Sequence, residues 1–576
     1  MSIRRETETM NTFRIGLLAV AAVVSATAAQ AQSNTTNSYD GNGSVTQLNT
    51  GGASLPSPAY RNLFNCFGLP TDGTTALPTG CTARAHTDIS INQGSVGSGG
   101  GQRAFFSHSR AQLGSGQPAG PLHIGHSDAA LTQAQIALYD NPAGGSGSPL
   151  SAGQSLAAAG VAPSGATQFA NPRASYGPMI QIPALGTPVT IAYDPVYKMR
   201  RATSGTVIRY RFNVQNFRST GGLRLDAEAY CKIFSGQITN WNDPKLTALN
   251  NGVSLRAAND FTPVASWSVP IKVAVRDDNS GTTALFTRHL RAACETHWGA
   301  TVTAAILNAS NPSNLSAGFS QGFPGMATNS SGTTGTCVAS TNTFLAGTWM
   351  RGRGNEGVAN CVAGNGTDIP LPPPTVTGAA LTVQNGTIGY LSPDFVLPAA
   401  TVSNPAFAAL GLHTANLQNA AGNWIAPTTT ATQLALGALP APTGADKTNP
   451  FKWVGRPEGI YVDGGGPVVN PIALPPASIP LAYPIVGTTN FMVYTCYANN
   501  TVRTLIANNT ASEATQGYLN WFYKRPTSVN TIALASGLVP MPTATRLAIQ
   551  TNFLNGGTSP LRIRTAPAGG VCTDGA

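Results

Sequence analysis

Residues 273–286 read VAVRDDNSGTTALF, and this stretch joins two kinds of secondary structure. The apolar run before the arginine is typical of a buried strand, and apolar residues recur at helical spacing after the two threonines. Ser280 or Asp278 can cap the helix, and Gly281 lets the backbone approach another group closely. Strands alternate with helices elsewhere in the chain as well, so the sequence predicts an α/β fold with a strand-to-helix turn here.

The same turn is rich in groups that bind anions. The first N–H groups of a helix lack intrahelical acceptors, and the helix dipole favours negative charge there. Ser280 and Thr282 add hydroxyl donors, and Arg276 adds a planar guanidinium suited to an oxyanion. Asp277 or Asp278 can orient that guanidinium. For this turn alone, an ordinary helix cap with a surface Arg–Asp pair remains the simpler interpretation.

Two further segments have the same character. GGASLPSPAYRNLF (51–64) places small residues and Ser54 before a helical pattern, and NQGSVGSGGGQRAFF (92–106) places Ser98 in a glycine-rich turn before another. The second segment fails the dinucleotide fingerprint, because Gln102 occupies the position of the last glycine. A phosphate-binding loop of the nucleotide-hydrolysing type is also missing from the sequence. These turns therefore indicate an anion site but not a nucleotide site.

A carboxylate follows the apolar run in HIGHSDAAL (123–131), at Asp128. An acid beside an anion site requires that the anion carries a proton. Phosphate keeps a proton near neutral pH and sulfate does not, so a buried carboxylate that accepts this hydrogen bond selects phosphate. The alternative is an aspartate that caps a helix.

Bulk composition limits the remaining possibilities. The 576 residues allow two or more domains, and only 10% of them are charged, with a net charge of +10. The basic residues form no dense cluster, so nucleic acid is a poor candidate partner. The eight cysteines form an even set without a C-x-x-C pair, which favours disulfides in an exported protein. Proximity in sequence suggests the pairs 66–81 and 337–361.

The first 31 residues have the pattern of a signal peptide. Arg14 precedes an apolar run, and Ala29-Gln30-Ala31 forms a cleavage site. The start is either Met1 or Met10, because the region before Met10 is long and acidic for a signal peptide. No later segment has about 18 uninterrupted apolar residues. We therefore expect a soluble protein that is periplasmic or secreted.

Together, these motifs resemble those of the periplasmic phosphate-binding protein of the phosphate ABC transporter, a PstS-like family that includes DING-type secreted relatives. VAVRDDNSGTTALF resembles its R-x-D-G-S-G-T-[TS]-x-x-F motif, and GGASLPSPAY its G-A-G-A-T-F-P-x-P-x-Y opening. VGSGGG and HIGHSDAAL are similar to its second and third turns. GNEGVANCV (354–362), TIGYLSPDF (387–395) and YPIVGTTNF (483–491) support the match. The motifs follow in family order from about residue 51 to 540.

The resemblance implies two α/β lobes of the type II periplasmic-binding-protein fold, joined by crossing hinge strands and closing over the anion. The expected parts are a signal peptide (1–31), a loose N-terminal arm (32–50), lobe one (51–185 plus 484–576), lobe two (186–483), a neutral insertion in lobe two (about 398–446) and a loop insertion (141–167).

The resemblance also implies a ligand set. The implied phosphate ligands are Ser54, Leu55 through its backbone N–H, Ser98, Asp128, Arg276, Ser280, Gly281 and Thr282, supported by Asp278 and Gly97. Ser54, Leu55 and Asn279 depart from the Thr, Phe and Gly of the family pattern. Asp278 is then the partner of Arg276, and Asp277 is expected to face solvent. No metal or cofactor is implied. The expected partners are inorganic phosphate and the membrane subunits of an ABC permease, with the protein a monomer.

Enzymatic and interaction functions are the alternatives. Gly318–Gly322 fits the G-x-S-x-G pattern of hydrolases, but no strand pattern precedes it. His123-x-x-His126 stands apart from other potential metal ligands. A secreted phosphatase-like activity and a surface or interaction protein on the same fold therefore remain as alternatives to a binding protein that is not an enzyme.

Overall fold

The computed structural model describes the greater part of the chain. The described residues are 46–71, 76–113, 120–140, 173, 176–200, 207–215, 222–329, 333–364, 382–396, 410–463, 466–524, 526–555 and 561–564. The predicted signal peptide (1–31) and the loop insertion (141–167) lie outside them. Among the described residues, no helix combines the length and the apolar character that a membrane crossing requires.

The first of two large sheets has six strands in the order β19-β4-β18-β3-β1-β2. β1 pairs in parallel with β2 and β3, whereas β18 pairs antiparallel with β3 and β4. Its strands are β1 (Thr46–Gly52), β2 (Ile89–Ser95), β3 (Ile124–Ser127), β4 (Met179–Pro188), β18 (Val486–Tyr494) and β19 (Val539–Pro540). The helices of this part are α1 (Ser57–Phe67), α2 (Ser98–Ser107), α3 (Gln133–Asp140), α12 (Asn500–Ala507), α13 (Tyr518–Lys524), α14 (Pro526–Ala535) and α15 (Thr543–Ile549).

The second large sheet has the order β10-β11-β9-β12-β5-β13, extended by β6 and β7, which branch from β12. β9 lies in the middle and pairs in parallel with β11 and β12. Its strands are β5 (Thr190–Tyr193), β6 (Val196–Arg200), β7 (Val207–Arg211), β9 (Ile271–Arg276), β10 (Cys337–Ser340), β11 (Thr348–Gly352), β12 (Thr382–Leu391) and β13 (His413–Thr414).

Further elements surround this second sheet. The helices are α5 (Ala227–Phe234), α6 (Pro244–Leu249), α7 (Gly281–Ala293), α8 (Glu295–Leu307) and α9 (Gly354–Ala363). Helix α11 (Thr429–Leu436) instead contacts β4, β18 and β19 of the first sheet. A three-stranded sheet holds β8 (Arg224–Leu225), β14 (Asn416–Gln418) and β15 (Trp424–Ile425), and a hairpin holds β16 (Ile460–Asp463) and β17 (Gly466–Val469).

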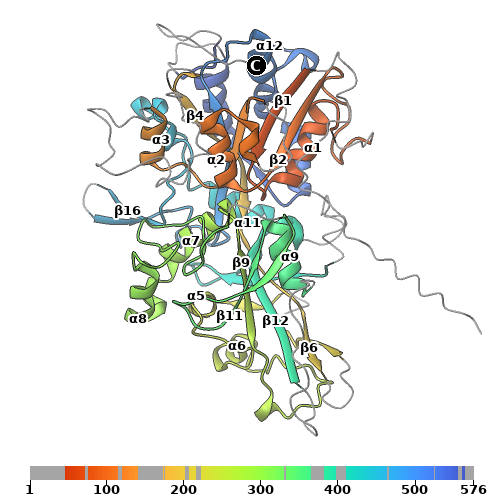
Figure 1. Ribbon diagram of the computed structural model, residues 1–576, viewed down its shortest axis with the longest axis vertical. Coiled ribbons are helices and arrows are strands. Elements are labelled where there is room, and N and C mark those ends of the chain that lie inside the picture. Colours follow the sequence, from red (N-terminus) through yellow and green to blue (C-terminus); the bar gives the residue numbers. More distant parts are fainter. Residues whose placement is uncertain are drawn as a thin grey trace, which may run out of the picture.

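The two large sheets lie in different halves of the molecule, the first in the upper half and the second in the lower half of Figure 1. The chain passes from β4 to β5 through Val189 and returns just before β18. These two passages are paired, because the Val189 N–H donates to the Ile485 carbonyl at 2.9 Å and the Tyr483 hydroxyl donates to the Val189 carbonyl at 3.2 Å. The predicted two-lobe α/β architecture with crossing strands is confirmed.

The exact lobe boundaries stay a prediction, and one segment crosses them. Phe451, Trp453 and Val454 were expected in lobe two (186–483), yet they pack in the hydrophobic core of the first sheet. Apolar side chains can join either core after a short connection, and the sequence pattern does not say which.

The expectation of a loose arm up to residue 50 is wrong for its last residues. β1 begins at Thr46, and Leu48 is fully buried opposite Ile91 of β2. The polar composition concealed this strand, because its polar groups bond within the sheet. The Thr50 hydroxyl, for example, donates to the Asn92 carbonyl at 2.9 Å.

The neutral segment at 398–446 is also more than an insertion. Residues 398–409 lie outside the described part of the chain, but from residue 410 on the segment belongs to the fold. β13 pairs with β5, and β14 pairs in parallel with β8 and buries Leu417. The described part of this segment is therefore integrated into the fold through strand pairing and does not form a separate surface lobe.

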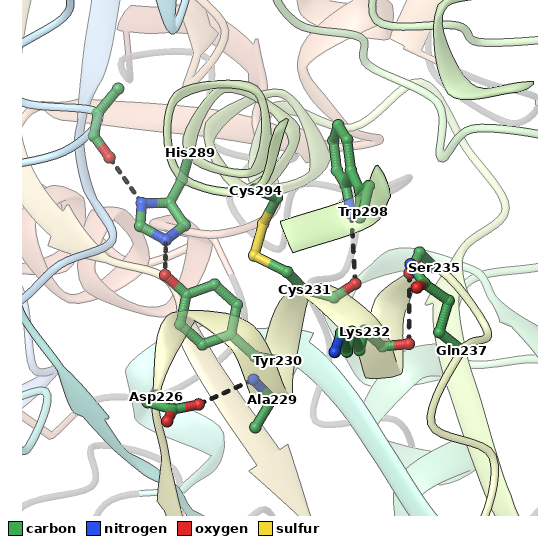
Figure 2. Close-up of a disulfide and its surroundings, with 11 residues drawn as sticks. Asp226, Ala229, Tyr230, Cys231, Lys232, Ser235, Gln237, His289, Cys294 and Trp298 are labelled. Carbon is green, nitrogen blue, oxygen red and sulfur yellow. Dashed lines mark hydrogen bonds between the residues drawn. A yellow bond between two sulfur atoms is a disulfide. The ribbon is translucent and has the colours of Figure 1, made fainter. Parts of the chain in front are cut away.

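Disulfides join elements within each half. The predicted pairs Cys66–Cys81 and Cys337–Cys361 are confirmed. A third pair, Cys231–Cys294, links α5 to the end of α7 and is drawn in Figure 2. Beside it, Tyr230 and His289 bond through the Tyr hydroxyl and Nε2 at 2.9 Å, and His289 Nδ1 bonds to the Ala473 carbonyl at 2.7 Å. Burial lowers the pKa of His289 to about 4, so this ring is neutral near pH 7. These links fix α7, the helix that begins at the predicted anion turn.

Candidate functional site

The predicted site residues gather where the two halves of the molecule meet. They come from the turns after β1, β2, β3 and β9, four strands that run parallel to a neighbour. Turns at the carboxyl ends of parallel strands commonly form ligand sites in α/β proteins. All ten predicted residues are buried: Ser54, Leu55, Gly97, Ser98, Asp128, Arg276, Asp278, Ser280, Gly281 and Thr282.

Arg276 lies at the centre of this group and is 1% exposed. Its Nε donates to Asp278 Oδ1 at 2.8 Å and its Nη2 to Asp278 Oδ2 at 2.6 Å. Nη2 also donates to the Ser54 hydroxyl at 3.0 Å, and Nη1 donates to the Thr282 hydroxyl at 3.2 Å. The guanidinium therefore contacts hydroxyls of both halves while one carboxylate holds its plane.

Asp278 is the residue that orients the guanidinium. Burial alone would raise its pKa, but the charge and hydrogen bonds of Arg276 lower it below the usual value. Asp278 Oδ1 also accepts the Gly354 N–H at 3.2 Å, which ties the pair to the start of α9. A buried pair of this kind is held by geometry and by its extra hydrogen bonds.

The expectation that Asp277 faces solvent is wrong. Its side chain is 11% exposed and lies 3.0 Å from Arg351 Nη1. Its backbone carbonyl accepts the Asn329 N–H at 2.7 Å. The sequence does not distinguish the two adjacent aspartates. Asp277 is buried because Arg351 on the neighbouring strand β11 pairs with it.

Asp128 follows β3 and faces the cleft from the other half. Burial raises its pKa to about 7, against the opposing effects of the Thr489 hydroxyl, the Arg276 charge and the Ser98 hydroxyl. Its Oδ1 atom is buried and has no hydrogen-bond partner. A buried carboxylate oxygen without a partner can accept a hydrogen bond from a bound ligand.

Ser98 and the start of α7 supply donors. The Ser98 hydroxyl accepts the Asp128 N–H at 2.9 Å, which leaves its own proton to point elsewhere. Ser280 caps α7 by accepting the Thr283 N–H at 3.1 Å, so the first N–H groups of this helix open toward the cleft. Since α7 is 13 residues long, its dipole adds to the positive potential there.

The two halves touch one another directly around the site. The Gly99 N–H donates to the Asn279 carbonyl at 3.1 Å, and Gln321 Nε2 donates to Gln102 Oε1 at 3.0 Å. A Cβ added at Gly281 would lie 2.1 Å from Ser98 Oγ and 2.6 Å from Asp128 Cβ. The cleft is therefore closed, and the backbone of one half rests against the other.

Sequence reasoning missed several residues of the site. The Asn355 amide donates to the hydroxyls of both Ser54 and Thr282, at 3.4 Å each. Thr489 bonds to the buried Tyr60 hydroxyl at 3.0 Å and influences Asp128. Both residues lie in motifs that carried the family resemblance, but only their approach in three dimensions reveals these contacts.

Two more buried carboxyl groups lie behind the site. Burial raises the pKa of Glu356 to about 7 and that of Asp394 to about 7. The negative charge of Asp278 adds to the raised pKa of Glu356, and the negative charge of Glu356 adds to that of Asp394. Asp394 is not among the predicted ligand residues, and its side chain bonds to Ser392, so its ionisation can be tested through the stability of the fold.

The alternative motifs do not assemble a second site. Ser320 lies in a loop after α8, where its Oγ accepts the Gly322 N–H at 3.2 Å, and not in a turn between a strand and a helix. His126 packs its ring against Tyr60 and Phe491, and burial lowers its pKa to about 3. Among the described residues, no three His, Cys, Asp or Glu side chains gather as metal ligands.

Similarity to known proteins agrees with this geometry. Residues 37–526 match the PBP superfamily domain. A protein named "Phosphate-binding protein", from an unknown prokaryotic organism, is 26% identical over 465 residues, which cover 80% of this chain and 87% of that protein. "Alkaline phosphatase L" of Pseudomonas aeruginosa is 25% identical over 515 residues, which cover 89% of this chain and 90% of that protein.

Among solved structures, that of a high affinity periplasmic phosphate-binding protein, PfluDING, bound with phosphate is similar with a TM-score of 0.51 and 21% identity. The match covers 90% of this chain and 97% of that chain. The two-lobe architecture and the cleft between the lobes are those of the periplasmic-binding-protein class. The chain belongs to the PBP superfamily, and the predicted resemblance to PstS-like proteins is confirmed.

The close approach at Gly281 predicts that closure is sensitive to a single added methyl group. Gly281→Ala should weaken ligand binding by at least about tenfold, because the Cβ would collide with Ser98 and Asp128 only when the lobes close. Folding should be preserved, since alanine favours a helix start over glycine. Small-angle scattering with ligand should show a more open molecule than the wild type.

Gly437→Ala is the matched control for this experiment. Gly437 ends α11 at φ −58°, and its added Cβ would approach only the Leu434 carbonyl, at 3.1 Å. Equal affinity and equal compactness of Gly281→Ala and the control would contradict the closed packing.

Asp394 predicts a pH dependence of folding stability. Its pKa is about 7 in the folded protein and about 4 in an unfolded chain, so the free energy of unfolding should fall as pH rises from about 4 to about 7. Asp394→Asn cannot ionise and should lose less stability between pH 5 and pH 8, by on the order of 1–3 kcal/mol. Urea unfolding of both proteins at the two pH values measures this difference. If the free energies of unfolding of the two proteins change equally with pH, the raised pKa of Asp394 is contradicted.

Proposed function

We propose that this protein binds inorganic phosphate with high affinity in the closed cleft between its lobes. The observation that carries the proposal is the pairing of a fully buried, oriented guanidinium with a buried carboxylate whose Oδ1 atom has no partner. The first group attracts an oxyanion, and the second requires that the anion carries a proton.

Each predicted ligand has a role in this proposal. Arg276 neutralises the negative charge and has one N–H group, on Nη1, left to donate to the anion. The hydroxyls of Ser54, Ser98, Ser280 and Thr282 and the backbone N–H groups of Leu55 and Gly281 are the proposed donors to the phosphate oxygens. Asp128 accepts the proton of the phosphate. Gly97 supports the second turn, where its φ is +87° and an added Cβ would collide with Asp278 Oδ2, so a side chain has no room there.

Closure strengthens these interactions. With the site residues buried, water no longer competes for the hydrogen bonds of the anion, and each charge acts through a lower effective dielectric. A fully ionised anion such as sulfate would place an oxygen lone pair against Asp128, and this repulsion in a dry site supports selection of phosphate.

We further propose that the protein is exported, works as a soluble monomer in the periplasm or outside the cell, and either delivers phosphate to an ABC permease or scavenges it. The signal-peptide pattern of residues 1–31 and the names of the similar phosphate-binding proteins support this setting.

Hydrolysis of phosphate esters is a second candidate, because proteins named "Alkaline phosphatase L" are similar over 89% of this chain. The same arginine would then hold the phosphoryl group of the substrate. Turnover of a chromogenic phosphate ester by the wild type, lost in Arg276→Ala, would support this candidate, and a lack of turnover in the wild type would remove it.

Asp128→Asn tests the proposed selection of phosphate. The amide places N–H donors or a weaker acceptor where the carboxylate accepted a proton, so phosphate affinity should fall by about tenfold or more. Rejection of sulfate should relax, because the charge repulsion is gone. Calorimetry with phosphate and with sulfate measures both, and a wild type that binds neither anion, or both equally, would overturn the proposed function.

A further inference from the structure

Asn355 lies in the first turn of α9, is fully buried and is held in one orientation. Its Oδ1 accepts the Ser392 N–H at 3.1 Å, so its Nδ2 group points the opposite way, toward the cleft. There Nδ2 donates to the hydroxyls of Ser54 and Thr282, at 3.4 Å each. The bond to Ser54 crosses from one lobe to the other and therefore forms only in the closed molecule.

The hydroxyl oxygens of Ser54 and Thr282 each accept two hydrogen bonds. A hydroxyl has one donor proton and two acceptor lone pairs. The Ser54 oxygen accepts from Arg276 Nη2 at 3.0 Å as well as from Asn355. The Thr282 oxygen accepts from Arg276 Nη1 at 3.2 Å as well as from Asn355. Both oxygens thus have both acceptor positions filled, which leaves each hydroxyl only its proton to offer.

We infer that Asn355 is a positioning residue that, together with Arg276, commits the hydroxyls of Ser54 and Thr282 to donate into the cleft. This inference rests on the proposed binding of phosphate. Arg276 alone fills one lone pair of each oxygen, and the hydroxyl proton could then turn away from the anion. The second donor removes that freedom once the lobes close, so both hydroxyl protons are directed at the enclosed anion.

As a consequence, the site side chains have separate roles as hydrogen-bond donors and acceptor. Committed hydroxyls cannot accept a hydrogen bond, so the single proton of a bound phosphate cannot be placed on Ser54 or Thr282. It is directed to Asp128, whose Oδ1 atom lacks a partner. Asn355 therefore contributes to specificity through the residues it orients.

A double-mutant cycle tests whether Asn355 acts through Ser54. Calorimetry with inorganic phosphate is performed on the wild type, Asn355→Ala, Ser54→Ala and the double variant. Each single change should weaken binding by about tenfold. The double variant should lose clearly less than the hundredfold expected of independent sites, because removing the Ser54 hydroxyl removes one of the two groups that Asn355 orients.

Asn355→Asp supplies a second test with nearly the same shape. Its carboxylate would accept hydrogen bonds from both hydroxyls and so reverse their direction, and its charge would repel the anion. Phosphate affinity should fall by at least about a hundredfold, and the loss should deepen as pH rises and the new acid ionises. The loss in Asn355→Ala should not change with pH in this way. This variant decides the question if Asn355→Ala does not fold.

Asn470→Ala is the matched control. Asn470 is 2% exposed and donates to the carbonyls of Arg456 and Glu458, away from the cleft, so its phosphate affinity should equal that of the wild type. Additive losses in the cycle, or wild-type affinity in Asn355→Ala, would overturn the inference while the proposed function stands. A wild type that binds no phosphate would overturn both.

Discussion

The buried pair of Arg276 and Asp278 is the interaction on which the site depends. A guanidinium in a dry cleft is costly unless its charge and its N–H groups are matched, and Asp278 does both through two bonds of 2.8 and 2.6 Å. With Nε and part of Nη2 committed to the carboxylate, the remaining N–H groups point in one direction. The adjoining hydroxyls and the start of α9 are placed around that direction, so the pair defines the geometry for every other group.

The proposed site around this pair contains few charged groups and a close contact between the lobes. In the proposed site Arg276 is the cation, Asp128 is the acceptor carboxylate and the other proposed donors are neutral, so the proposed binding does not need a strongly basic surface. Only 10% of the chain is charged, yet a small fraction of those charges lies where burial makes each one effective. Glycines at the contact between the lobes allow backbone to meet backbone, as where the Gly99 N–H donates to the Asn279 carbonyl.

The sequence predicted those elements that depend only on residues close to one another in the chain. The strand, cap and helix of residues 273–286 follow from apolar spacing and from Ser280, and the structure has them as β9 and α7. The strand at Thr46 and the sheet pairing of residues 413–418 were not predictable, because their polar or neutral residues are satisfied by partners far away in sequence. Asn355 was missed for the same reason, since its role arises where Ser54 and Thr282 converge.

The paired passages between the lobes constrain how the molecule can move. A backbone hydrogen bond joins Val189 to Ile485, and the Tyr483 hydroxyl adds a second link. Two linked segments behave as a ribbon, which bends readily across its flat face but resists twisting and sideways shear. We therefore expect the lobes to separate like the covers of a book, about one axis. If the lobes rotate about one hinge axis, the open molecule has few relative orientations of its lobes. Closing then costs little orientational entropy.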